Sequence, residues 1–210
     1  MKNFNDFSTK AKNRLLLLSN LILVGLLIFS GYSFKNRLNT TSTELKAEEV
    51  KSLEAFEDVY KVLMSPRCMN CHPAGDIPLQ GDEQKLHAMS PMRGVDGKGI
   101  LTLKCSNCHA PEGVPGEHTP PGNPEWHLPP ADMKMVFEGK SPRELALQLV
   151  DPERNGHKDM EALKAHADDG LVKEGWTMGG DRALPPLSYE EFKEAWLTWI
   201  ENGAVAPPAE

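Results

Sequence analysis

Cys68-Met69-Asn70-Cys71-His72 and Cys105-Ser106-Asn107-Cys108-His109 are two copies of one pattern, and they decide which fold this chain can adopt. Each copy is a C-x-x-C-H sequence, at which a c-type haem is covalently attached. The two copies use all four cysteines of the 210-residue chain. In such a site both thiols bond to the haem and the histidine binds the iron, and positions i, i+3 and i+4 share one face of a helical turn. The sequence therefore predicts two covalently bound haem c groups, with His72 and His109 as iron ligands.

Three other chemistries use paired cysteines, and each explains less of the pattern. A zinc site with four cysteine ligands has no need of a histidine directly after each pair. A thioredoxin-type redox pair belongs to a βαβ unit, and the sequence shows no such unit. Two disulfides are compatible with an oxidising compartment but leave both histidines unexplained.

The N-terminal 40 residues have the composition of an export signal. Residues 1–14 carry four basic residues and one acidic residue, and an apolar run of 20 residues follows from Leu15 to Phe34. That length suits a membrane-spanning helix, exceeds a typical secretory apolar region, and is not followed by an A-x-A cleavage site. We therefore expect a cytoplasmic segment over 1–14, a signal anchor over 15–34 and a tether over 35–50. The alternative is a cleaved signal peptide that leaves a soluble periplasmic protein. Either arrangement places the C-x-x-C-H motifs on the periplasmic side of a bacterial inner membrane.

The charge balance beyond this segment argues against nucleic acid as a partner. Six Lys/Arg and one Asp fall in residues 1–40, so the remainder holds 17 of the 23 basic and 29 of the 30 acidic residues, a formal net charge of −12. Such a surface repels phosphate backbones and favours a redox partner with a basic docking patch. Solubility alone is the simpler explanation of the same charge.

The remaining sequence predicts one mostly α-helical domain with long ordered loops, over residues 51–210. Apolar residues at helical spacing indicate a helix over 44–64 that ends before Pro66, and a shorter helix is expected over 160–166. Ser141 with Glu144, and Ser188 with Glu191, each have the spacing of a capping box at the start of a helix. Strand signals are weak. Trp196 and Trp199 fall on one helical stripe and are expected in the core.

The two motifs are too close together for two separate haem domains. Cys68 and Cys105 are 37 positions apart. Both haems are therefore expected to share one core and to lie close enough for electrons to pass between them. The Pro/Gly-rich segments can wrap large apolar groups, and Trp176–Gly180 is a candidate haem-contact loop or a plain turn.

Each iron also needs a sixth ligand unless it is catalytic, and spacing alone does not select one. Five histidines and several methionines remain after the motifs are assigned. His127 lies in a proline-rich loop that can hold an imidazole in place. Arg93 could pair with a haem propionate, although an ordinary turn arginine explains it equally well.

Beyond the two motifs, a string of short sequences runs from Arg67 to Ala204. It comprises Gly75-Asp76, Gln80-Gly81, Arg93-Gly94, Trp126-His127-Leu128, Glu138-Gly139-Lys140-Ser141, Asp151-Pro152, Asn155-Gly156 and Gly175-Trp176. With this string the chain resembles a family of small dihaem cytochromes c that are often labelled subunits of isoquinoline 1-oxidoreductase. The resemblance implies His87 and His127 as sixth ligands, with Met135 as the main rival. It also implies a molybdenum hydroxylase as a possible partner, although the chain has no molybdopterin or iron–sulfur signature of its own.

Together these features predict an electron carrier rather than an enzyme. We expect a membrane-anchored periplasmic dihaem cytochrome that passes electrons from a dehydrogenase or quinol-linked donor to a cytochrome or oxidase. The alternative is a small dihaem peroxidase-like enzyme with one open iron site, and it would need a displaceable sixth ligand and a polar distal pocket.

Overall fold

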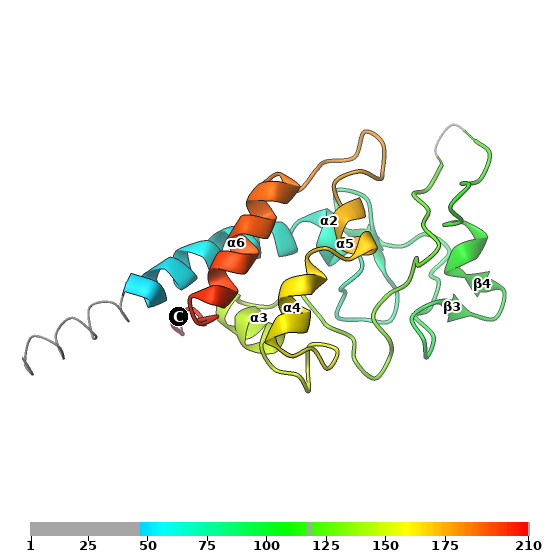
Figure 1. The fold of residues 1–210 in the computed structure, drawn as a ribbon. Helices are drawn as coiled ribbons and strands as arrows, with labels where there is room; N and C mark the ends of the chain where they lie inside the picture. Colours follow the sequence, from blue (N-terminus) through cyan, green and yellow to red (C-terminus); the bar gives the residue numbers. More distant parts are fainter. Residues whose placement is uncertain (1–46, 117–118, 210) are drawn as a thin grey trace, which may run out of the picture. The chain divides into compact units, whose positions relative to one another are not determined.

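A computed structural model describes residues 47–116 and 119–209 of the chain (Figure 1). A helix over residues 47–63 comes first, followed by α2 (Pro66–Met69) and a hairpin of β1 (Leu79–Gln80) and β2 (Lys85–Leu86). A second hairpin of β3 (Gly99–Ile100) and β4 (Leu103–Lys104) leads into the 3-10 turn η1 (Cys105–Asn107). The chain ends with α3 (Pro142–Leu149), α4 (Met160–His166), α5 (Gly170–Glu174) and α6 (Tyr189–Glu201).

The apolar core is built by four helices. The helix over 47–63 and α6 lie side by side, since the rings of Phe56 and Trp199 are 4.8 Å apart and Ser52 Oγ donates to Trp199 O at 2.9 Å. Leu145 of α3 and Leu163 of α4 are fully or almost fully buried in the same cluster. These helices present apolar residues at 3.6-residue spacing, so one face of each is buried.

Local sequence signals placed most of the helices correctly. Both predicted capping boxes are present: the Ser141 and Ser188 side chains each accept from the backbone N–H three residues later, and Glu144 and Glu191 accept in return. The prediction of a helix over 160–166 is confirmed, and so is the prediction that Trp196 and Trp199 belong to the core.

The expected fold class needs correction. A mostly α-helical domain behind one transmembrane helix is not what the described residues form, because most of them lie in turns and loops and two short antiparallel hairpins are present. None of the helices in 47–116 and 119–209 is both long and apolar enough to cross a membrane. Their apolar residues form a single stripe on each helix, which suits packing against a neighbour. The segment for which the span was predicted, 15–34, lies outside the described residues.

Hydrophobic packing is distributed unevenly along the chain. Between Leu79 and Leu128, no apolar side chain that the structure describes is buried, and the buried side chains there are those of Arg93 and Asn123. This segment contains the second C-x-x-C-H motif and is joined mainly by backbone hydrogen bonds, such as Leu128 N to Gly97 O at 3.0 Å. At Gly97 a Cβ would meet the Leu128 carbonyl oxygen, so this close approach requires glycine.

Candidate functional site

The first motif lies at the end of a short helix. Pro66 takes the first position of α2, where its missing N–H costs nothing, and Cys68 follows within the helix. Backbone bonds from Cys71 N to Cys68 O at 3.2 Å and from His72 N to Met69 O at 2.9 Å continue the turn. The two thiols and the imidazole are thus carried by one helical turn, as attachment to a single macrocycle requires.

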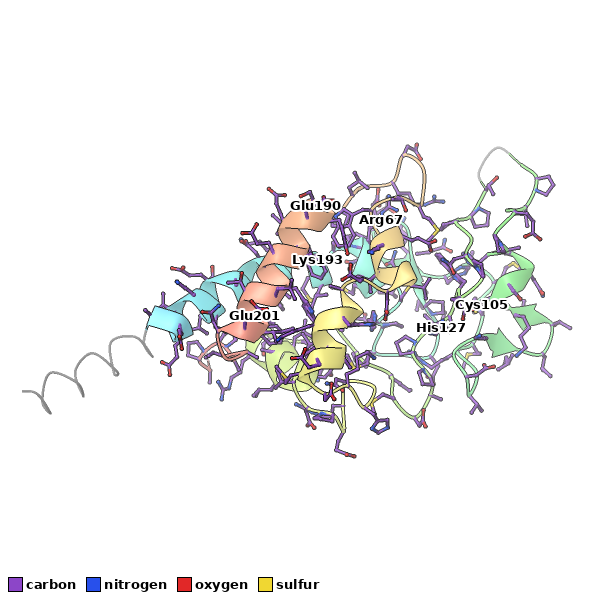
Figure 2. The ribbon with its side chains drawn as sticks, in the orientation of Figure 1. Arg67, Cys105, His127, Glu190, Lys193 and Glu201 are labelled. Carbon is purple, nitrogen blue, oxygen red and sulfur yellow. The ribbon has the colours of Figure 1, made fainter. Side chains whose placement is uncertain are left out.

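The second motif adopts a similar turn without an α-helix. Cys105 begins η1, and its carbonyl accepts from Cys108 N at 3.2 Å and from His109 N at 2.9 Å. The β3–β4 hairpin directly precedes this turn. Cys105 N donates to Lys98 O at 3.2 Å, which fixes the start of the turn against the hairpin. Figure 2 shows Cys105 on this part of the chain.

The imidazoles of both motifs are held through the same ring atom. His72 Nδ1 lies 2.6 Å from Met135 O, and His109 Nδ1 lies 2.5 Å from Pro121 O. A carbonyl oxygen can only accept, so each Nδ1 carries the hydrogen and each Nε2 keeps its lone pair. Burial lowers the pKa of His72 to about 4 and also lowers the pKa of His109, so both rings are neutral near pH 7. This is the tautomer and the outer hydrogen bond of a metal-ligating histidine.

An aromatic ring stacks on each of the same two histidines. Phe137 lies parallel to His72 with the ring centroids 3.9 Å apart, and Trp126 lies parallel to His109 at 4.3 Å. The backbone carbonyl of each histidine is also bonded to the loop that carries its aromatic partner. His72 O accepts from Phe137 N at 2.9 Å, and His109 O accepts from Asn123 N at 3.2 Å. Two motifs far apart in sequence thus have the same set of partners. The residues present fit two haem groups in this respect.

The four cysteines form no disulfide with one another, and they lie in chemically different settings. Burial raises the pKa of Cys68 to about 12 and that of Cys71 to about 11, and it also raises the pKa of Cys105. Cys105 contributes to the shift at Cys71, so the two motifs lie within electrostatic reach of each other. A thioredoxin-type pair uses a thiolate with a lowered pKa, and the direction of these shifts is the opposite. Among the residues in 47–116 and 119–209, no group of three or more His, Cys, Asp or Glu is arranged to hold a metal ion.

His87, one of the predicted sixth ligands, faces the histidine of the second motif. It follows β2, where His87 N donates to Pro78 O at 2.9 Å, and its ring centroid is 6.0 Å from that of His109 at an interplanar angle of 66°. Two metal–imidazole bonds of about 2.0 Å each place the nitrogens roughly 4 Å apart and the ring centres about 6 Å apart. The observed centroid separation is compatible with two imidazoles on one metal ion and equally with edge-to-face packing of the two rings. His87 Nδ1 is hydrogen-bonded to Ala88 O at 2.7 Å, which leaves Nε2 with its lone pair.

His127 and Met135 do not face either motif histidine in the same way. His127 lies on the loop that carries Trp126, and its Nδ1 is hydrogen-bonded to Glu125 O (Figure 2). Met135 contributes its carbonyl to His72, while its side chain packs against the apolar core. In the part of the chain that the structure describes, His87 and His109 are the histidine pair in ring contact.

Arg93 is buried, and together with one other cation it shares a single carboxylate. Its side chain is 1% exposed and donates to Pro129 O at 2.6 Å, Gly75 O at 3.0 Å and Asp76 Oδ1 at 3.3 Å. Asp76 also forms an ion pair with Lys134 at 2.8 Å, so its one carboxylate is paired with both Arg93 and Lys134. A propionate near Arg93 would balance this charge, and the predicted role of Arg93 as a haem-propionate partner stays a prediction.

The Trp176–Gly180 loop has a protein partner that the sequence did not suggest. Arg67, directly before Cys68, donates to the carbonyls of Met178, Arg182 and Ala183 (Figure 2). Gly179 has φ +98°, a backbone conformation that favours glycine, and a Cβ there would displace the Arg67 guanidinium. The loop is thereby attached to the first motif.

Sequence reasoning missed the residues that hold the motif histidines. The Met135 and Pro121 carbonyls carry no side-chain signal, and Phe137 reads as an ordinary core residue. Trp126 could have been found, because it directly precedes the histidine that the proline-rich loop presents.

Comparison with known proteins adds no relative: no protein-family model, curated protein or solved structure matches this chain. The resemblance to small dihaem cytochromes c stays a prediction.

Proposed function

We propose that this chain is a dihaem c-type cytochrome that carries electrons between redox proteins in the bacterial periplasm. The observation that carries the proposal is the shared environment of His72 and His109. Each ring donates Nδ1–H to a loop carbonyl, stacks on an aromatic ring and keeps Nε2 for a metal. When bound, each haem would supply one centre that accepts and releases single electrons.

The cysteine and histidine roles follow from this proposal. Cys68 and Cys71 would bind the first haem and Cys105 and Cys108 the second, with Arg93 as a candidate partner for a propionate. His87 is proposed as the second axial ligand of the His109 iron, because its ring lies beside that of His109 and its Nε2 has a free lone pair.

An electron carrier needs both axial positions of each iron filled, whereas the peroxidase-like alternative needs an iron with an open or displaceable ligand. His87, whose ring lies beside that of His109, would fill the second axial position at one of the two sites. A fully low-spin protein that binds neither cyanide nor carbon monoxide is expected for a carrier. Carbon monoxide binding to the untreated reduced protein would favour the enzyme.

The negative surface charge of the chain favours a redox partner that has a basic docking patch. Exposed carboxylates gather on the helix over 47–63 and on α6, whose two ends carry Glu190 and Glu201 (Figure 2). Charge of this sign steers a cytochrome or oxidase that has a basic docking patch, and the effect weakens as salt is added. The electron donor is proposed to be a dehydrogenase, a quinol-linked protein or a molybdenum hydroxylase.

The decisive experiment is intact-mass analysis of the exported protein together with its haem absorption spectrum. We expect two haem adducts that survive acid–acetone extraction, and one adduct in the variant with Cys105 and Cys108 both changed to Ala. Free thiols or bound zinc in the wild-type protein would overturn the proposal.

A further inference from the structure

Two buried amide side chains lie at the loops that hold the motif histidines, and the role we infer for them rests on the proposed function. Gln148 is 6% exposed and Asn123 is 9% exposed. Burying an amide is costly unless it is hydrogen-bonded, so the partners of each amide show what it secures. In both cases the side chain joins a histidine-holding loop to a helix.

The loop over residues 135–138 contacts His72 in three ways. Met135 O accepts from His72 Nδ1 at 2.6 Å, and the Phe137 ring stacks on the imidazole. His72 O also accepts from Phe137 N at 2.9 Å. The orientation of the His72 ring and the strength of its Nδ1–H bond therefore depend on where this loop lies.

Gln148 attaches the middle of this loop to α3. Its Nε2 donates to Val136 O at 3.0 Å, and Val136 lies between the residue whose carbonyl holds the imidazole and the residue that stacks on it. On the same helix, Leu145 and Leu149 are buried in the apolar cluster. A donor on a helix packed in this way keeps its position better than one on a loop.

The loop over residues 121–126 contacts His109 in the same three ways. Pro121 O lies 2.5 Å from His109 Nδ1, and the Trp126 ring stacks on the imidazole. His109 O accepts from Asn123 N at 3.2 Å. The second histidine thus depends on a loop just as the first one does.

Asn123 attaches this second loop to α5 through its side chain. Its Nδ2 donates to a carboxylate oxygen of Glu174, and its Oδ1 accepts from Glu125 N at 2.5 Å. Its backbone carbonyl accepts from Trp126 N at 3.1 Å. One residue therefore fixes the loop to a helix and also fixes the backbone of the stacking tryptophan.

A buried amide of this kind can act on stability alone or on the metal as well. A ligating histidine is a more basic ligand when its other ring N–H is held by an acceptor. If the loop loosens, the acceptor carbonyl moves away from Nδ1–H, and the imidazole becomes a weaker donor to ferric iron. The midpoint potential of that haem then rises. A residue that only stabilises the fold leaves the potential of a bound haem unchanged.

We propose that Gln148 is a positioning residue for the first haem and that Asn123, held by Glu174, is a positioning residue for the second. Each amide acts on one iron only, through the hydrogen bond at Nδ1 of its motif histidine. The two potentials are thereby set separately, one from α3 and the other from α5.

The test compares Gln148→Met with Asn123→Leu in the full-length holoprotein, by spectroelectrochemistry and by low-temperature EPR of the oxidised state. Both changes remove the N–H donor, keep a side chain of similar size and add no charge. We expect each variant to raise one midpoint potential and to shift one low-spin signal, with a different haem affected in each. The variant with Cys105 and Cys108 both changed to Ala keeps the first haem and identifies its potential.

Milder changes provide the readout if either variant does not fold. Gln148→Asn withdraws the amide by one methylene group and should also raise the potential of the first haem. Glu174→Gln and Glu174→Ala remove the same charge, but only the alanine removes the acceptor for Asn123. The potential of the second haem should therefore be higher in Glu174→Ala than in Glu174→Gln.

Two results would overturn the proposal. One is that neither potential moves, or that both move equally, in Gln148→Met and Asn123→Leu. The other is an equal second-haem potential in the two Glu174 variants. Intact mass separates such a failure from failure of the proposed function, because wild type and all these single variants should carry two haems. A wild-type chain without haem contradicts the proposed function itself.

Discussion

The hydrogen bond made by one ring nitrogen determines what the other nitrogen can do. In His72 and His109 the Nδ1–H is directed at a backbone carbonyl, so the chain itself selects the tautomer whose Nε2 keeps a free lone pair. His87 has the same local arrangement and faces His109. At each site, the hydrogen bond at Nδ1 of a single histidine therefore determines which ring nitrogen is free to bind a metal.

Substitution of His87 tests the second site directly. In His87→Ala we expect one iron, the one bound by His109, to become high-spin and open to carbon monoxide. In His87→Met we expect the midpoint potential of that iron to rise by on the order of 0.1 V, within the range of about 0.8 V that axial ligation spans. EPR and spectroelectrochemistry measure both effects, and His157→Ala serves as the control. Unchanged spectra in His87→Ala would show that His87 is not a ligand.

Asp168, in the loop between α4 and α5, forms polar contacts with both α5 and α6. Asp168 lies between α4 and α5 and accepts from Lys193 and Tyr189 of α6, both at 2.8 Å, and from Lys173 of α5 at 3.1 Å. The hydrogen bond from Lys193 is the largest cause that holds the pKa of Asp168 far below its usual range, and those from Tyr189 and Lys173 act in the same direction. The ionised carboxylate therefore stabilises the folded state.

The pH dependence of unfolding tests this arrangement. Because the folded-state pKa is lowered, the contribution of Asp168 is fully present above its unfolded-state pKa of about 4 and is lost as the pH falls below that value. Asp168→Asn should thus unfold at lower denaturant than wild type at pH 7, and the difference should shrink below about pH 4. The control is Asp58→Asn, whose partner Lys61 lies in the same helix. A difference that does not vary with pH would rule out this role.

Across the whole described chain, helical packing and the haem motifs occupy different regions. The buried apolar cluster comes from the helices and Phe137, whereas the segment between Leu79 and Leu128 buries no apolar side chain among its described residues. The proposed second haem would supply apolar contacts that this segment lacks, so its removal should act locally.

The variant with Cys105 and Cys108 both changed to Ala should separate the two regions. We expect backbone amides over residues 93–116 and 119–128 to exchange hydrogen much faster than in wild type. Amides of α3, α4 and α6 should keep most of their protection, because their core does not depend on the second haem. Hydrogen exchange with mass spectrometry measures this, with Ser106→Ala as the matched control. Equal loss of protection in the helices would show that the two regions fold as one unit.

The features that sequence analysis predicted correctly are local ones. The capping boxes at Ser141 and Ser188 and the apolar stripe of α6 depend on residues three or four positions apart. The Met135–His72 bond could not be predicted, because it joins a backbone carbonyl to a ring 63 positions away. The two hairpins were missed because each strand is only two residues long and has no periodicity to read.

The unequal exposure of the four sulfur atoms sets the order in which an unloaded chain would be damaged. Cys68 and Cys71 are half-buried and burial raises the pKa of both thiols, whereas Cys108 is exposed to solvent. Oxidants act on accessible sulfur first. If the chain is the proposed cytochrome, delayed haem attachment would leave Cys108 open to oxidation while Cys68 and Cys71 are still usable. Early haem attachment or a reducing environment would then matter most for the second motif.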